Sequence, residues 1–173
     1  MNLNKYLSSE KDTWYWGLAE VKDISNIIVM ARAHFQREID GLLTPDELFY
    51  AYNLDKALTN QRHNLAVEQV ITAKDKATDK LLAYAWIGRG SKAPYSQDEL
   101  AEAKILHIDL NATARQRISI IVQTLSHWTN WAKACAIPVL VSTSIREDQS
   151  AFMNIHKELG FSVRGSIAYK RLL

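Results

Sequence analysis

The sequence is poor in the residues that stabilise very small or fibrous folds. Its 173 residues include one cysteine, six glycines and three prolines. A single cysteine, Cys135, excludes an intrachain disulfide, and its apolar neighbours favour a buried structural thiol over a nucleophile. So little glycine and proline excludes collagen-like and low-complexity chains and leaves no candidate linker. We therefore expect a single domain that covers residues 1–173.

Long apolar runs and an excess of one charge are also missing. The 21 basic and 19 acidic residues give a formal net charge of +2, so nothing indicates nucleic acid or membrane as a partner. No apolar run is long enough to span a bilayer, and the N-terminus lacks the apolar core of a secretory signal. Hydrophobic residues make up 47% of the chain, enough for a core without disulfide or metal. These features predict a cytoplasmic globular protein.

What the chain does have is a clear succession of strand and helix patterns. Strands are expected over residues 14–21, 66–73, 81–88, 104–110 and 138–145, with a hairpin turn across 74–80 and two short strands around Gly165. Helices are expected from Asp23, from Thr44 to about Leu58, from Asn111 to Ala134, and from Gln149 to Leu159 with Gly160 as its stop. The segment 89–101 is interpreted as a loop or short helix.

This order of elements predicts the fold class. A strand–helix–strand unit in the middle of the chain requires a parallel pair, whereas the hairpin requires an antiparallel one. We expect an α/β fold with a mixed sheet of about six to seven strands flanked by helices. The continuous apolar run over 138–145 suits the centre of that sheet.

The C-terminal residues carry a more specific pattern. Ala151 to Phe161 reads as an alanine, apolar positions at helical spacing, and a closing Gly160-Phe161. Together with the element order, this segment resembles the last helix of the GNAT superfamily of N-acetyltransferases. The resemblance implies a GNAT-like sheet, acetyl-CoA as cofactor, and direct transfer of acetyl to a primary amine through a tetrahedral intermediate.

The resemblance also implies where acetyl-CoA binds. In this family backbone N–H groups at the start of the long helix hold the pyrophosphate, and the motif is Arg or Gln, two residues, Gly, one residue, then Gly or Ala. Arg115 falls on the first position, but Ile118 and Ile120 fall on the small ones, where β-branched side chains obstruct the backbone's approach to phosphate. The arginines could instead be solvated residues of a core helix. The implied cofactor contacts are Leu110, Arg115, Arg117, Ile118, Ser119 and Ile120.

The acid and base candidates follow from the same resemblance. His156 stands where many family members have a tyrosine that protonates the departing thiolate. Histidine can do this because its unperturbed pKa lies near neutrality, but it can equally be a surface helix residue. Glu102 or His107 could relay a proton from the amine. His107 and Asp109 lie two apart on one strand face.

Two interpretations of function remain. The first is an N-acetyltransferase whose acceptor is a small-molecule or peptide amine. The second is a catalytically inactive GNAT-fold structural or interaction protein with a protein partner, for example a phage virion or assembly component. Ile118, Ile120 and the missing tyrosine favour the second, whereas Arg115 and His156 favour the first. No metal is expected, because no metal-ligand spacing connects the remaining histidines, His34, His63 and His127.

Overall fold

The computed structural model describes residues 3–6, 12–39, 42–144 and 149–164. Five strands form one sheet in chain order: β1 (Trp14–Leu18), β2 (Glu68–Asp75), β3 (Leu81–Arg89), β4 (Leu100–Ile108) and β5 (Val139–Ser142). The first four pair antiparallel, and β4 and β5 pair parallel, so the expected mixed sheet is confirmed. The further strands expected around Gly165 lie outside the described residues.

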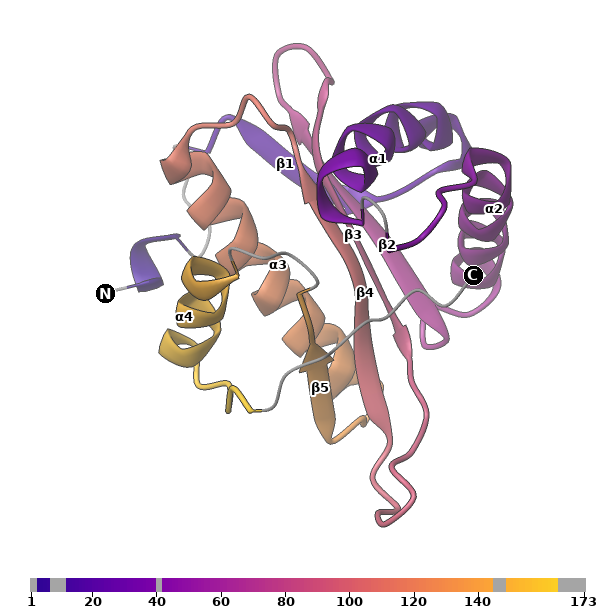
Figure 1. The fold of residues 1–173 in the computed structure, drawn as a ribbon, viewed down its shortest axis with the longest axis vertical. Helices are drawn as coiled ribbons and strands as arrows, with labels where there is room; N and C mark the ends of the chain where they lie inside the picture. The colour runs from indigo at the N-terminus through magenta and orange to yellow at the C-terminus, as the bar shows by residue number, and fades with distance from the viewer. Residues whose placement is uncertain (1–2, 7–11, 40–41, 145–148, 165–173) are drawn as a thin grey trace.

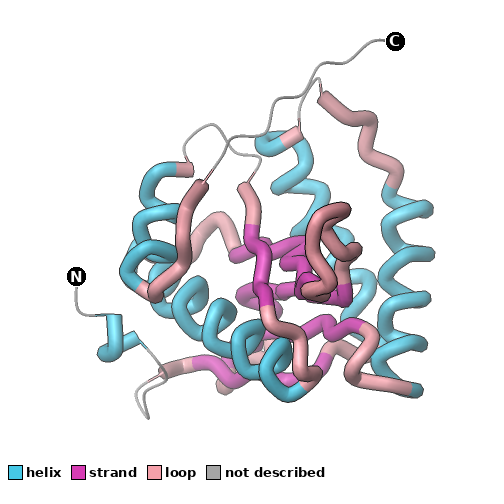
Figure 2. The backbone as a smooth tube through the Cα atoms, turned by 90° about the horizontal axis from the view of Figure 1, so that it is seen from below, coloured by secondary structure: helices cyan, strands magenta, loops and turns pink. Residues whose placement is uncertain are grey.

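Helices cover both faces of this sheet. The described helices are α1 (Ile24–Glu38), α2 (Glu47–His63), α3 (Ala114–Ala134) and α4 (Ser150–Glu158), with 3-10 turns η1 (Leu3–Tyr6) and η2 (Val21–Asp23). Figure 1 shows α1 and α2 on one face and α3 and α4 on the other. Figure 2 shows the strands between these layers. Each side has its own apolar cluster, and β2 and β3 are therefore buried on both faces. No helix within the described ranges is long and apolar enough to cross a membrane.

Two of the element boundaries that differ from expectation have an identifiable cause. Helix α2 begins after Asp46 rather than at Thr44, because the Asp46 carboxylate accepts the N–H of Phe49 at 2.9 Å and caps the helix. Strand β4 begins at Leu100, inside the segment interpreted as a loop or short helix, because Leu100 to Ala103 pair with β5. Pairing partners distant in sequence decide such a boundary, and local propensity does not show them.

The central position expected for β5 is wrong for the described sheet. Within the described ranges β5 pairs with β4 alone and is the outermost strand. Its residues are exposed to half-buried, and Leu140 packs against the cluster under α3. An apolar strand at an edge is stable here because α3 and α4 cover the face that Leu140 occupies.

A β-bulge in β4 determines where the sheet opens. Ile87 pairs with Ala103 and Trp86 with Ile105, so Lys104 has no opposite residue in β3. Pairing with β5 stops at the same point, since Ala103 and Ser142 are the last pair. Figure 1 shows β5 beside only the lower part of β4. Beyond the bulge the two strands separate, and the space between them forms the site.

Candidate active site

A cavity of about 480 Å³ opens where β4 and β5 separate. Its walls come from α1, the second half of β4, α3, the end of β5 with the residues that follow it, and α4. Ile118, Ile121 and Trp128 make an apolar wall on α3. Its polar side chains include Ser142 at the end of β5 and a histidine–carboxylate cluster on α1 and β4, besides Lys104, Arg117, Thr143, Ser144 and Gln149. A concave, largely apolar site with a few polar groups is typical of small-molecule binding.

His156 lies directly behind one of these polar groups. It is only 1% exposed, and its Nε2 lies 2.9 Å from the Ser142 hydroxyl. Its Nδ1 lies 2.9 Å from the carbonyl oxygen of Phe152, which can only accept, so Nδ1 carries the hydrogen. Burial lowers the pKa of His156, which favours the neutral ring. Neutral His156 therefore accepts the hydroxyl hydrogen of Ser142, and Ser142 rather than His156 lines the cavity.

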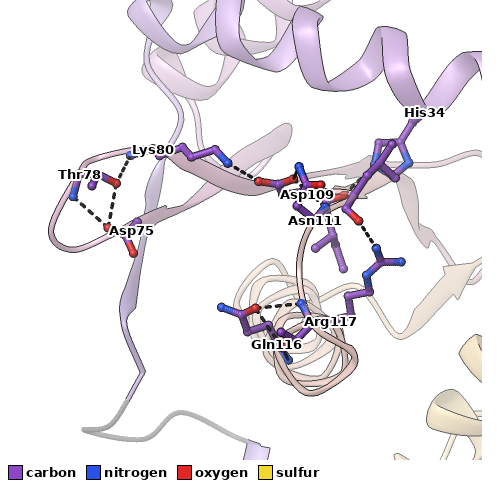
Figure 3. A network of polar contacts seen from close by, with 11 residues as sticks. His34, Asp75, Thr78, Lys80, Asp109, Asn111, Gln116 and Arg117 are labelled. Atoms are coloured by element: carbon purple, nitrogen blue, oxygen red, sulfur yellow. Dashed lines mark hydrogen bonds and ion pairs between the residues drawn. The ribbon is translucent and has the colours of Figure 1, made fainter.

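The first turn of α3 is closed by its own side chains. Thr113 and Gln116 form a reciprocal capping box, in which the Thr113 hydroxyl accepts the N–H of Gln116. The Arg117 guanidinium donates to the carbonyl oxygens of Ala112, at 2.9 Å, and Leu110. Figure 3 shows Gln116 and Arg117 bonded back onto the turn that precedes the helix. Arg117 thus holds this turn, although it also lines the cavity.

The structure separates the other predicted cofactor contacts. Ile118 lines the cavity, whereas Ser119 and Ile120 are buried behind it. The Ser119 hydroxyl hydrogen bonds to the Tyr6 carbonyl oxygen, and Ile120 packs under β1 and β3. Arg115 is exposed on the first turn. Leu110 contributes only its carbonyl to Arg117 and is not among the cavity-lining residues.

The two predicted base candidates lie far apart. His107 is 4% exposed and lines the cavity. Glu102 lies on β4 before the bulge, opposite Gly88, with its side chain against Gly90. It is not among the cavity-lining residues. Of the predicted acid and base residues, the cavity therefore brings together His107 and, through Ser142, His156.

Two residues of α1 complete a cluster around His107 that sequence reasoning missed. His34 Nδ1 lies 3.0 Å from Glu38 Oε1, and His107 Nε2 lies 3.3 Å from Glu38 Oε2. The two imidazole rings stack, with centroids 4.3 Å apart and planes 4° from parallel. Burial alone would raise the pKa of Glu38, but hydrogen bonds with His107 and His34 outweigh it and lower the pKa to about 2.

The cluster continues into the core through two tyrosines. His107 Nδ1 lies 2.6 Å from the Tyr84 hydroxyl, which lies 3.0 Å from that of Tyr50. Burial raises the pKa of both tyrosines far above neutrality, so both hydroxyls keep their hydrogens. At the other end, His34 Nε2 lies 2.8 Å from the Ile108 carbonyl oxygen. The i,i+4 spacing of His34 and Glu38 was the one feature of the sequence that pointed to this cluster. Only the fold brings this pair against His107 on β4.

The chain matches no protein-family model and no curated protein. Its fold is similar to many solved structures. An aminoglycoside antibiotic 6′-N-acetyltransferase from Acinetobacter baumannii has a TM-score of 0.66 and 14% identity over 92% of this chain and 98% of that one. A predicted acetyltransferase with acetyl-CoA from Clostridium acetobutylicum has a TM-score of 0.67 and 15% identity, over 91% and 96%.

A plant enzyme gives a similar result. Glucosamine-6-phosphate N-acetyltransferase from Arabidopsis thaliana has a TM-score of 0.61 and 10% identity over 92% of this chain and 99% of that one. Structural similarity at such low sequence identity shows a shared fold and does not show a shared activity. The similarity covers nearly the whole of each chain, and it agrees with the element order and the closing Gly160-Phe161. The chain has the fold of the GNAT N-acetyltransferases, in a form divergent in sequence.

Proposed function

We propose that this protein is an N-acetyltransferase that moves acetyl directly from acetyl-CoA to a primary amine. One observation carries the proposal: a single cavity at the divergence of β4 and β5 joins the Ser142–His156 pair to the His107 cluster. Acetyl transfer needs a proton acceptor near the amine and a proton donor near the leaving sulfur. The named enzymes of similar fold act on an aminoglycoside and on glucosamine 6-phosphate, and both act as N-acetyltransferases.

The residues present fit acetyl-CoA, which supplies an acetyl thioester with an electrophilic carbonyl carbon. Beyond the bulge, the β5 side of β4 has no described strand partner, so its backbone is placed to bind the amides of the pantetheine arm. Trp128 is 1% exposed, lines the cavity, and its Nε1 has no hydrogen-bond partner among the described residues. A buried N–H without a partner is costly, and a ligand carbonyl would satisfy it. Exposed Arg115 and the α3 dipole would meet the pyrophosphate, in place of a glycine loop.

Ser142 and His156 form the proton shuttle in this proposal. Oγ of Ser142 takes a proton from the reacting amine nitrogen. At the same time the hydroxyl hydrogen of Ser142 passes to Nε2 of His156, 2.9 Å away. The reverse movement delivers a proton from Ser142 to the departing sulfur. His156 thus acts as the general acid only through Ser142, and the shuttle starts from the neutral ring that burial favours. His107, across the cavity, is the base that prepares the amine.

Calorimetric titration with acetyl-CoA tests the proposal. We expect one site with a Kd below about 1 mM, equivalent to about −4 kcal/mol. Ala151 and Asn154 are both exposed on α4, but only Ala151 lines the cavity. Ala151→Trp should therefore abolish binding, whereas Asn154→Trp should leave it unchanged. Wild-type protein that binds no acetyl-CoA would rule out the transferase.

A non-catalytic GNAT-fold protein is the second candidate, and one feature favours it. The guanidinium of Arg117 is engaged by two carbonyls of its own loop, and the capping box occupies the N–H of Gln116. A helix start whose donors already hydrogen bond within the protein has fewer of them left to bind a phosphate. The calorimetric experiment separates the two candidates, because the inactive protein should give no heat with acetyl-CoA in either variant or wild type.

A further inference from the structure

We propose that Ser142 and His156 form a nucleophile–base pair that also hydrolyses esters of short carboxylic acids. Ser142 is the nucleophile, His156 is the base, and the indole N–H of Trp128 stabilises the oxyanion. The three side chains come from β5, α4 and α3, and Ser142 and Trp128 line the same cavity. The activity needs neither an amine nor acetyl-CoA, so it goes beyond the proposed transferase function.

The contact between Ser142 and His156 has the direction that nucleophilic catalysis requires. Oγ of Ser142 lies 2.9 Å from Nε2 of His156, within hydrogen-bond reach. Nδ1 faces an atom that can only accept, the Phe152 carbonyl oxygen at 2.9 Å, so the lone pair of the neutral ring is on Nε2. Burial lowers the pKa of His156 and so favours this neutral ring. The Ser142 hydroxyl therefore donates its hydrogen to His156, and its oxygen can attack a carbon bound in the cavity.

The imidazole of His156 is held in one orientation. The carbonyl of Phe152 fixes the tautomer, as the carboxylate does in a serine–histidine–aspartate triad. The rings of Phe152 and Phe161 pack against the imidazole at 64° and 73°, with centroids 4.4 and 4.9 Å away. Once His156 has taken the hydroxyl hydrogen, its bond to the Phe152 carbonyl becomes charge-assisted and therefore stronger. The imidazolium is thus stabilised without a carboxylate beside it.

Trp128 supplies a hydrogen-bond donor for the charge that develops on the substrate. Its side chain is buried, and its Nε1–H has no hydrogen-bond partner in the part of the chain that the structure describes. An unpaired buried donor is unfavourable, and an oxygen atom bound in the cavity would remove that penalty. A fixed donor at a cavity with few waters is what stabilisation of an oxyanion requires. Trp128 therefore suits the carbonyl oxygen of an ester as it becomes negatively charged.

The cavity walls favour a short, uncharged acyl group. Ile118, Ile121 and Ile155 line the cavity together with Trp128, so an acyl chain has apolar surroundings. A carboxylate or ammonium group on that chain would lose its hydration there. The cavity volume of about 480 Å³ lies in the lower half of the range for ligand pockets, and the leaving group must share it. We therefore expect acyl groups from acetyl to butyryl.

The reaction takes two steps. In the first, Oγ of Ser142 bonds to the carbonyl carbon while the hydroxyl hydrogen passes to Nε2 of His156. The ester C–O bond breaks with its electron pair on the leaving oxygen, which takes the proton from His156. In the second, His156 takes a proton from water, the water oxygen bonds to the acyl carbon, and the bond to Oγ breaks with its pair on Oγ. The proton returns to Ser142, and a carboxylic acid leaves after the alcohol.

The same pair acts differently on acetyl-CoA. In the proposed transferase the pantetheine arm lies along β4, the thioester faces the amine, and Ser142 only carries protons. A compact ester has no such arm, so its carbonyl carbon can reach Oγ. Acylation of Ser142 is therefore expected from an ester and not from acetyl-CoA.

Hydrolysis of p-nitrophenyl acetate by the full chain, without CoA, tests the pair. Ser142→Ala should lower kcat at least about a hundredfold. Ser150 is exposed at the start of α4 and is not among the cavity-lining residues, so Ser150→Ala should leave kcat unchanged. Reaction of the ester with surface lysines or histidines would persist in both variants. A wild-type rate in Ser142→Ala would therefore overturn the proposal.

Phenylmethanesulfonyl fluoride gives a second readout that does not depend on turnover. Peptide mass spectrometry should find a single sulfonyl group, on Ser142, because the reagent bonds to a nucleophilic oxygen. His156→Gln should slow this labelling at least about tenfold, since Ser142 then lacks its base. A label on another residue, or an unchanged labelling rate in the His156 variant, would contradict the nucleophile–base assignment.

Trp128→Phe tests the oxyanion donor. The variant should lower kcat for p-nitrophenyl acetate about tenfold to a hundredfold and leave KM nearly unchanged, because such a donor acts in the transition state. Trp131→Phe is the control on the same helix, since its Nε1 already donates to the Leu65 carbonyl. A wild-type kcat in Trp128→Phe would overturn the role given to Trp128.

Failure of this inference can be told apart from failure of the transferase. Ester hydrolysis that depends on Ser142, in a protein that binds no acetyl-CoA by calorimetry, would remove the transferase and keep the hydrolytic pair. Acetyl-CoA binding and amine acetylation without Ser142-dependent ester hydrolysis would remove the hydrolytic pair and keep the transferase.

Discussion

Ser142 Oγ lies 2.9 Å from Nε2 of His156, whose Nδ1–H is held by the Phe152 carbonyl. If this pair moves one proton as a unit, removing either member should cost nearly as much as removing both. We expect Ser142→Ala, His156→Gln and the double variant each to lower kcat about tenfold to a thousandfold, with the acetyl-CoA Kd unchanged. Steady-state kinetics with calorimetry measure both quantities.

Two results would contradict this shuttle. Additive losses in the double variant would show that Ser142 and His156 act separately. An acetyl group found on Ser142 by mass spectrometry after mixing with acetyl-CoA alone would show a covalent route instead of direct transfer. Asn154→Gln, on the exposed side of α4, is the matched control for His156→Gln.

The buried ring of His156 should also make stability depend on pH. Burial lowers its pKa from 6.5, so in acid the unfolded chain takes up the proton before the folded one does. The free energy of unfolding should therefore fall as pH drops below about 6.5 and level off below the folded pKa. Urea unfolding of wild type and His156→Gln between pH 7.5 and 4.5 measures this. Subtracting the two profiles removes all other groups, and parallel profiles would contradict the prediction.

Regular periodicity made most of the fold predictable. The helical patterns that follow Asp23 and precede Ala134 predicted α1 and α3, and Gly160, with φ of 86°, ends α4 where expected. What the pattern could not show was that β5 is the outermost strand among the described residues and that β4 starts early. Both depend on which strands become neighbours, and single-sequence periodicity carries no information about that.

The site was predictable only in part, for a related reason. The family motif predicted a cofactor site at the first turn of α3, but Arg117 binds the carbonyls of its own turn and Ser119 faces Tyr6. Side-chain direction on the first turn depends on capping and packing that a motif does not encode. Glu38 was missed because an i,i+4 histidine–glutamate pair on an amphipathic helix is ordinary until a strand brings His107 against it.

Trp128→Phe should affect acetyl-CoA affinity more than stability. Its buried Nε1 has no partner among the described residues, so Trp128→Phe removes a costly donor and should change the unfolding free energy by less than about 1 kcal/mol. If a carbonyl of acetyl-CoA accepts this N–H, the variant should bind acetyl-CoA about three- to tenfold more weakly. Thermal unfolding and calorimetry measure the two effects.

Trp131 provides the control on the same helix. Its Nε1 donates to the Leu65 carbonyl at 2.7 Å, and it is not among the cavity-lining residues. Trp131→Phe should therefore lower stability by about 1–3 kcal/mol and leave acetyl-CoA affinity unchanged. A Trp128→Phe protein with wild-type affinity would show that Nε1 does not meet the ligand.

Of the two arginines in the first turn of α3, Arg117 should matter for stability and Arg115 for acetyl-CoA affinity. Arg117 donates to the carbonyls of Ala112 and Leu110, so Arg117→Ala should lower the unfolding free energy by about 1–3 kcal/mol by leaving those acceptors unpaired. Arg115 is exposed, so Arg115→Ala should leave stability within about 0.5 kcal/mol of wild type. Urea unfolding measures both.

Affinity should show the reverse order, because Arg115 is the residue that we propose to meet the pyrophosphate. Arg115→Ala should weaken acetyl-CoA binding about tenfold, and the loss should shrink at high salt, since the contact is between opposite charges at the surface. Arg115→Lys should restore part of it. If Arg115→Ala binds normally while Arg117→Ala does not, then Arg117 must leave its loop carbonyls to bind the phosphate, and the α3 turn must rearrange when the ligand enters.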